Sequence, residues 1–176
     1  MGRKKAALLA ALMVLSGMLA GCGREPAAPS SEEVSRAVQK PFEAAADIQM
    51  GGVAATVDLN RTEDGVFSFV FHEPKALDGM TVTMDDENIG LSYLGLHIEA
   101  DSEDVLNSAV TKAIVAAINQ AAEPEGITVG VEGSAVTVSG ETDAGEFTLT
   151  LDQKNQSLLT LSIPNLDLEC RFSGGQ

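Results

Sequence analysis

The feature that most constrains the fold of this chain is a two-residue alternation of apolar and polar side chains. Phe67, Phe69 and Phe71 share one parity, and the residues between and after them, such as Ser68 and His72, share the other. This alternation is typical of strands in an antiparallel sheet that is buried on one face and solvated on the other. Short turns rich in Gly, Asp and Asn separate the segments, which predicts that neighbouring segments pair as a meander.

Ten segments show this pattern, five before a long helical stretch and five after it. The first five cover residues 42–50, 53–60, 66–72, 80–84 and 89–98, and the second five cover 127–132, 135–139, 146–152, 157–163 and 165–172.

Two helices are predicted. Ser30 and Glu33 have the spacing of a capping box, so a short helix is expected over Ser31–Lys40. The second, longer helix is expected to take Asp101 or Ser102 as its N-cap. Apolar residues at helical spacing define its buried stripe: Leu106, Ala109, Val110, Ala113, Ile114, Ala117, Ile118 and Ala121.

The predicted fold class is α+β: a curved antiparallel sheet of about ten strands, a half-barrel, with the short helix and the long central helix packed on it. Ten strands make a sheet about 50 Å wide, whereas one helix covers about 10 Å. The sheet must therefore curl, either into a barrel with a filled core or into an open half-barrel with an apolar hollow. The candidate lining of such a hollow is Phe67, Phe69, Phe71, Met80, Val82 and Met84.

The stretch FSFVFHEPKALDGMTVTMDDENIGLSYLGL, residues 67–96, and the order of elements resemble the LolA/LolB-type lipoprotein carriers and related lipid-binding lipoproteins. The resemblance implies an open half-barrel with a helical lid that holds acyl chains. The chain departs from that family in having no Trp, one Tyr and no arginine that corresponds to the family's cavity.

The first 22 residues resemble the signal of a bacterial lipoprotein. A positive start, Arg3 to Lys5, precedes the apolar run Ala6–Ala20 and the sequence Leu19-Ala20-Gly21-Cys22. That run is too short for a comfortable membrane span and suits a signal peptide, residues 1–21. The resemblance implies cleavage between Gly21 and Cys22 and lipidation of the Cys22 thiol; a secreted protein with an incidental Cys22 is the alternative. Residues 22–31 are then a lipidated tether, and residues 32–176 form the domain.

The charge of the chain excludes one class of partner. Without the leader the chain has 8 basic and 26 acidic residues, a net charge of −18. Nucleic acid needs a basic face, so it is not an expected partner. Anionic lipid would also repel the domain, so the acyl anchor alone is expected to hold it to the extracytoplasmic side of the cell membrane.

Motifs for catalysis, metal binding or phosphate binding are lacking in the sequence, which favours a non-enzymatic protein without a cofactor. His72 and His97 are interpreted as structural residues, and Cys170 as a buried strand residue rather than a catalytic thiol. Residues 99–104, EADSED, carry carboxylates suited to calcium but lack the glycine and distal Glu of an EF-hand, so they are interpreted as an acidic helix start.

Two functions stay open at this point. The domain binds a lipid or another hydrophobic ligand in an open hollow, or it is a lipid-anchored interaction or structural module of the envelope with a closed core. The volume enclosed by the sheet distinguishes them, because ligand sites typically enclose about 300–1,000 Å³. The sequence names neither a ligand nor a protein partner.

Replacing Cys22 by Ser is expected to stop lipidation, because a hydroxyl is a far poorer nucleophile than a thiol. Unprocessed precursor should then accumulate, which immunoblotting and palmitate labelling of cells would show. Maturation and palmitate labelling equal to those of the parent chain would contradict the lipobox interpretation.

Overall fold

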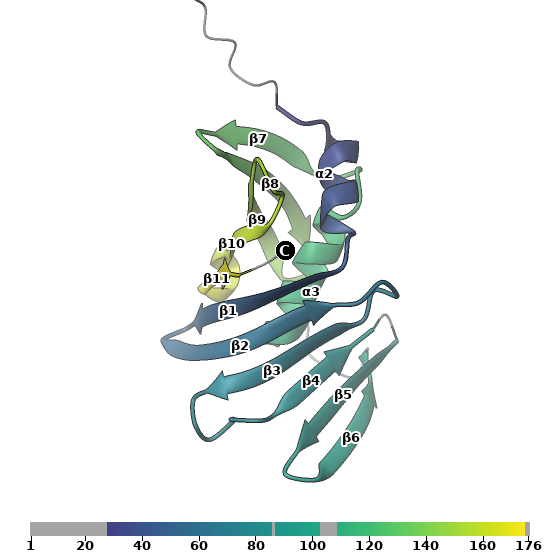
Figure 1. Ribbon diagram of the computed structural model, residues 1–176, viewed down its shortest axis with the longest axis vertical. Helices are drawn as coiled ribbons and strands as arrows, with labels where there is room; N and C mark the ends of the chain where they lie inside the picture. Colours follow the sequence, from purple (N-terminus) through teal and green to yellow (C-terminus); the bar gives the residue numbers. More distant parts are fainter. Residues whose placement is uncertain (1–27, 86, 103–108, 175–176) are drawn as a thin grey trace, which may run out of the picture.

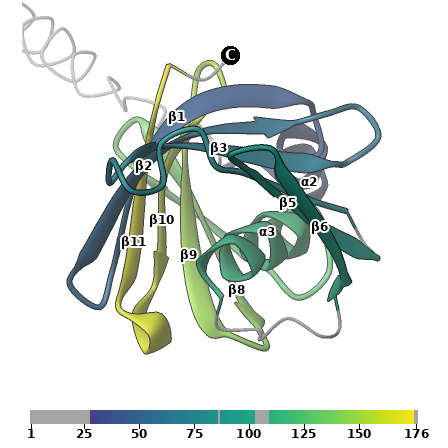
Figure 2. The same ribbon diagram turned by 90° about the horizontal axis from the view of Figure 1, so that it is seen from below.

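The computed structural model describes residues 28–85, 87–102 and 109–174. Its main element is one open antiparallel sheet of 11 strands, with the spatial order β6-β5-β4-β3-β2-β1-β11-β10-β9-β8-β7 (Figure 1). The sheet curves around the helix α3 (Figure 2). The predicted α+β class with a curved half-barrel sheet is therefore confirmed, with one more strand than expected.

The described elements follow the chain in this order: α2 (Ser31–Val38), β1 (Phe42–Met50), β2 (Val53–Arg61), β3 (Phe67–Glu73), β4 (Thr81–Met84), β5 (Asn88–Tyr93), β6 (Leu96–Asp101), α3 (Val110–Ala121), β7 (Thr128–Glu132), β8 (Ala135–Thr142), β9 (Gly145–Asp152), β10 (Leu158–Ile163), a short 3-10 helix (Pro164–Leu166) and β11 (Leu168–Ser173).

The predicted alternation appears directly as burial on the concave face of the sheet. In β3, Phe67 and Phe69 have no exposed surface and Phe71 is 8% exposed. In β11, Leu168 and Cys170 are buried while the residues between and after them are exposed. One face of every central strand is thus apolar and covered, as the two-residue period requires.

Helix α3 covers this concave face at β8 and β9. Its alanines Ala113, Ala117 and Ala121 are at most 1% exposed, and Ile114 and Ile118 are fully buried. Alanine side chains let a helix approach a sheet closely, and the isoleucines fill the space between the alanines. The buried stripe predicted for the long helix is therefore confirmed from Ala113 onward, whereas Ala109 and Val110 are half-buried and Leu106 lies outside the described residues.

Helix α2 begins with the predicted capping box. The Glu33 backbone N–H donates to Ser30 Oγ at 3.3 Å, and the Ser30 N–H donates to Glu33 Oε2 at 3.0 Å. The other end of α2 is tied to the end of α3, since Ser35 Oγ and Gln39 Nε2 both donate to the carbonyl of Ala122. The helix ends two residues earlier than expected, at Val38.

The segment 89–98, expected as one strand, forms a hairpin instead. Leu94 and Gly95 have φ angles of 49° and 83° and make the two-residue turn between β5 and β6. Positive φ at both positions is the geometry of a type I′ turn, whose strand twist suits a hairpin. Leu is an unusual residue for such a turn, which is why the sequence pattern did not separate the two strands.

Two further boundaries differ from the expected ones. Asp101 ends β6, where it pairs with Asn88, and the described part of the long helix, α3, begins at Val110 after Ala109. The last predicted segment starts with a 3-10 turn, because Pro164 suits the first position of a helix and Asp167 adopts a left-handed conformation, with φ of 49°.

The reactivity of Cys170 tests which side chains of the last strand, β11, face the core. Burial, with the charge of Asp47 as a smaller cause, raises the pKa of its thiol to about 12. The thiol is therefore protonated at neutral pH and should react slowly with a maleimide in native protein and quickly in denaturant. Mass spectrometry of timed reactions measures both rates, and rapid labelling of the native form would contradict the parity.

Candidate functional site

The candidate site is the open end of the half-barrel, where the apolar concave face continues beyond the part that is covered. One row of paired residues crosses it: Phe69 faces Val82, Val82 faces Leu91, and Leu91 faces Ile98. Along this row the exposed fraction rises from 0% at Phe69 to 8% at Val82 and 58% at Ile98, with Leu91 half-buried. Apolar side chains therefore reach solvent on the same face as the core.

A second row lies beside the first and shows the same gradient. Phe71 is 8% exposed, Met80 is half-buried, and Tyr93 pairs with Leu96, which is 68% exposed. Leu94, in the turn, is 84% exposed. We call Leu91, Tyr93, Leu94, Leu96 and Ile98 the β5–β6 apolar patch. Such a contiguous exposed group is typical of a surface that binds something, whereas singly exposed apolar residues are ordinary.

The six residues predicted to line a hollow lie together on the concave face, as their parity required. Five of them are buried, namely Phe67, Phe69, Phe71, Val82 and Met84, and Met80 is half-buried. They are packed side chains that lie next to the β5–β6 apolar patch on the same face of the sheet.

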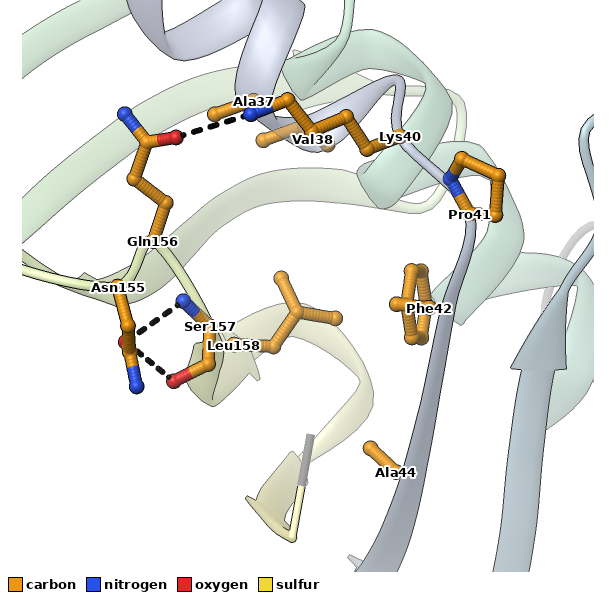
Figure 3. Close-up of a pocket in the computed structure, with 10 residues that line it drawn as sticks. All are labelled: Ala37, Val38, Lys40, Pro41, Phe42, Ala44, Asn155, Gln156, Ser157 and Leu158. Atoms are coloured by element: carbon orange, nitrogen blue, oxygen red, sulfur yellow. Dashed lines mark hydrogen bonds between the residues drawn. The ribbon is translucent and has the colours of Figure 1, made fainter. Parts of the chain in front are cut away.

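A small, partly open cavity lies at the other side of the half-barrel, between the end of α2, the start of β1 and the turn before β10. Its volume is about 80 Å³, and its apolar lining includes Phe42, Ala44 and Leu158 (Figure 3). Lys40 Nζ donates to Gln156 Oε1 at 3.4 Å on its rim. A volume of about 80 Å³ is well below the 300–1,000 Å³ of typical ligand sites.

The wall between this cavity and the core is aromatic. The Phe42 ring meets the Phe67 ring edge-on at 6.4 Å between centroids, and the Arg61 guanidinium lies 5.4 Å from the centroid of Phe67. Arg61 Nη1 also donates to the carbonyl of Val38 at 2.7 Å. Arg61 therefore joins α2, β2 and β3 at this end of the sheet, a role that the sequence pattern did not indicate.

A wider groove of about 540 Å³ runs between α3 and the turn joining β8 to β9. Its lining is largely polar and charged, with Lys112, Gln120, Glu141 and Asp143 among its residues. It therefore lacks the predominantly apolar lining that is usual for a hydrophobic ligand site.

Both histidines lie on exposed strand faces and not in the core. His72 Nε2 is 2.7 Å from Asp58 Oδ2, and His97 contacts Ser92 Oγ through Nδ1 at 2.8 Å and Glu99 Oε1 through Nε2 at 3.2 Å. Each histidine thus has a structural partner. Within the described residues, no three His, Cys, Asp or Glu side chains gather as a metal site requires.

The predicted leader, Gly21 and Cys22 lie outside the described residues, as does part of the acidic run 99–104. In the part of the chain that the structure describes, no helix has the length and apolar character needed to cross a membrane.

Three solved structures show what the fold is similar to. An uncharacterized conserved protein from Thermus thermophilus matches with a TM-score of 0.52 and 12% identity, over 81% of this chain and 82% of that one. A LolA superfamily protein from Nitrosomonas europaea gives a TM-score of 0.45 and 9% identity, over 85% and 94%. The lipoprotein LppX of Mycobacterium tuberculosis gives 0.42 and 13%, over 80% and 90%.

Among these three, only the Thermus thermophilus protein exceeds a TM-score of 0.5, so it is the one whose likeness supports the curved antiparallel fold. At these identities the likeness concerns the fold alone. No family model matches the chain, and no curated protein is similar to it in sequence.

The most exposed part of the candidate site was missing from the sequence prediction. Leu94, Leu96 and Ile98 belong to a segment that was expected to be a strand like the others. The available signal was Gly95 between two leucines, because a glycine flanked by alternating residues can mark a hairpin turn.

Truncating Phe69 to Ala is expected to lower the free energy of unfolding by about 3–5 kcal/mol, because the ring is fully packed in a core that cannot fill the space it leaves. Urea unfolding followed by circular dichroism measures the change. Val53→Ala, at a position that is 68% exposed, is the control and should change stability little. A loss well under about 2 kcal/mol for Phe69→Ala would show that the ring borders open space.

Proposed function

We propose that this protein is a membrane-anchored, non-enzymatic lipoprotein that binds a lipid or another hydrophobic ligand at the open end of its half-barrel. The observation that supports this proposal is the exposure gradient along Phe69, Val82, Leu91 and Ile98. The apolar face continues from the buried side chains of β3 and β4 to the exposed side chains of β6, so apolar surface is available to a ligand. Each methylene group moved from water onto such a surface contributes up to about 0.8 kcal/mol.

The packing of the core limits where the proposed ligand can bind. Phe67 and Phe69 have no exposed surface, so a ligand does not reach them without displacing protein. The ligand therefore lies on the side chains of Leu91, Leu96 and Ile98. Of the six residues predicted to line the hollow, Met80 and Val82 are nearest to it. The site is a shallow apolar trough rather than a deep pocket.

The proposed anchor is Cys22, lipidated after removal of residues 1–21, with residues 22–31 as the tether. Two or more acyl chains hold a protein stably on a bilayer, whereas one does so only marginally. The net charge of −18 after leader removal would keep the domain away from an anionic bilayer, so the trough would stay accessible from the aqueous side. The proposed location is the extracytoplasmic side of the cell membrane.

Binding of a fluorescent fatty-acyl probe to residues 22–176 carrying Cys22→Ser tests the ligand site, since this chain lacks acyl groups of its own. Leu91→Glu places a carboxylate in the middle of the trough and should weaken probe binding at least tenfold. Val53→Glu, on an exposed position elsewhere, should leave the affinity unchanged. Thermal unfolding of both variants shows whether the fold is retained.

A parent chain that binds no probe, or equal affinities for the parent and Leu91→Glu, would overturn the ligand proposal. The second candidate function, an envelope interaction module with a closed core, would then be favoured. Its own supporting observation is the packed core, in which Phe67, Phe69 and Leu149 have no exposed surface.

A further inference from the structure

The outer edge of β6 combines exposed apolar side chains with unused backbone groups. Strand β6 is the first in the sheet order, so in the part of the chain that the structure describes no strand pairs with its outer side. Leu96 and Ile98 on this strand are 68% and 58% exposed. Edge strands of this kind readily pair with another strand, and proteins usually protect them with charges, proline or bulges.

The turn between β5 and β6 determines which backbone groups point outward. Tyr93 and Leu96 flank the two-residue turn, and hydrogen-bonded and non-bonded pairs alternate along an antiparallel ladder from such a turn. Leu96 and Ile98 therefore direct their N–H and C=O groups toward β5. His97 and Glu99, which face Ser92 and Gly90, direct theirs away from the sheet.

The β6 strand of a second copy can pair antiparallel with these outward-pointing backbone groups. Three registers centre the pairing on residues 97 to 99. His97 opposite His97 and Glu99 opposite Glu99 each place identical side chains together, and the two glutamates repel one another. In the third register Ile98 faces Ile98, and His97 of each copy faces Glu99 of the other. Only this register places complementary side chains at both outward positions and joins the apolar residues at its centre.

We propose that two copies of this chain pair through β6 in that third register, which joins their sheets edge to edge. Directly opposed residues lie on the same face of a sheet, so the concave apolar faces of both copies lie on the same side. Leu96 of one copy then lies opposite Ala100 of the other, and the two Ile98 side chains touch. This pairing is independent of the proposed ligand, because it rests on the backbone edge and on charge.

The arrangement of the fold leaves this edge accessible. Figure 1 shows β6 and α2 near opposite ends of the long axis, so the edge lies away from the point where the tether enters the domain. The tether 22–30 adds up to about 30 Å of reach when extended. Two anchored copies can therefore bring their β6 edges together without moving α2.

Cysteine cross-linking of the full-length lipoprotein in its own membrane tests the register. In the proposed pairing the two Cα atoms of residue 98 are about 4.5 Å apart, within disulfide range, whereas residue 97 of one copy is about 7–8 Å from residue 97 of the other. Ile98→Cys should give a disulfide-linked dimer with a mild oxidant on a non-reducing gel. His97→Cys and Glu99→Cys should give several-fold less.

Two controls make the result interpretable. The parent chain, whose Cys170 is fully buried, gives the background. Val53→Cys, at a position that is 68% exposed and begins strand β2, reports random collision. Dimer yield from Ile98→Cys no greater than from Val53→Cys would overturn the proposal, and so would stronger cross-linking at residue 97 or 99.

Charge exchange adds a second readout in the Ile98→Cys background. His97→Glu places glutamates opposite each other and should lower the dimer yield several-fold. Adding Glu99→Lys restores an attractive pair and should recover the yield. Equal yields in all three chains would contradict the His97–Glu99 pairing. Probe binding by Leu91→Glu is measured separately, so the failure of either proposal can be told from the failure of the other.

Discussion

The fold depends on one constraint: a short helix must cover a very wide apolar sheet. Helix α3 has 12 residues and is about 18 Å long, whereas 11 strands span about 50 Å if the sheet is flat. Curvature brings more of the sheet toward the helix, and the buried alanines of α3 permit close approach. Within the described residues, the same apolar face is buried at Phe69, on the inner strand β3, and exposed at Ile98, on the terminal strand β6.

Much of the fold could be predicted because the sheet is one-sided. A period of two identifies the buried parity of each strand without knowledge of its neighbours, and Phe67, Phe69 and Cys170 are buried as that period requires. Local backbone geometry was harder to predict. Leu94 adopts a positive φ although Leu has no preference for it, and Asp101, expected near a helix start, ends strand β6 opposite Asn88.

The candidate site could be predicted only in part, for a different physical reason. Phe69 and Ile98 occupy equivalent positions on one concave face, so periodicity cannot distinguish them. What separates them is their place in the sheet, because Phe69 lies on the inner strand β3 and Ile98 on the terminal strand β6. That strand order is a property of the folded chain. The period of two therefore indicated the shared buried face of Phe67, Phe69 and Val82 but not which residues of that face stay exposed, and the role of these residues in ligand binding stays a prediction.

The proposed ligand and the proposed partner copy bind different parts of strand β6, namely its side chains and its outward backbone groups. The side chains of Leu96 and Ile98 project from the face of the sheet, whereas the outward backbone groups of His97 and Glu99 lie in its plane. A hydrophobic ligand would cover the first set and leave the second set in water. Strand pairing would use the second set, and of the first set it would bring together only the two Ile98 side chains. Pairing also places Leu96 and Ile98 of one copy beside the equivalent face of the other. A dimer would thus lengthen the apolar trough without closing it, so the two forms of binding are compatible and each leaves the other's surface in place.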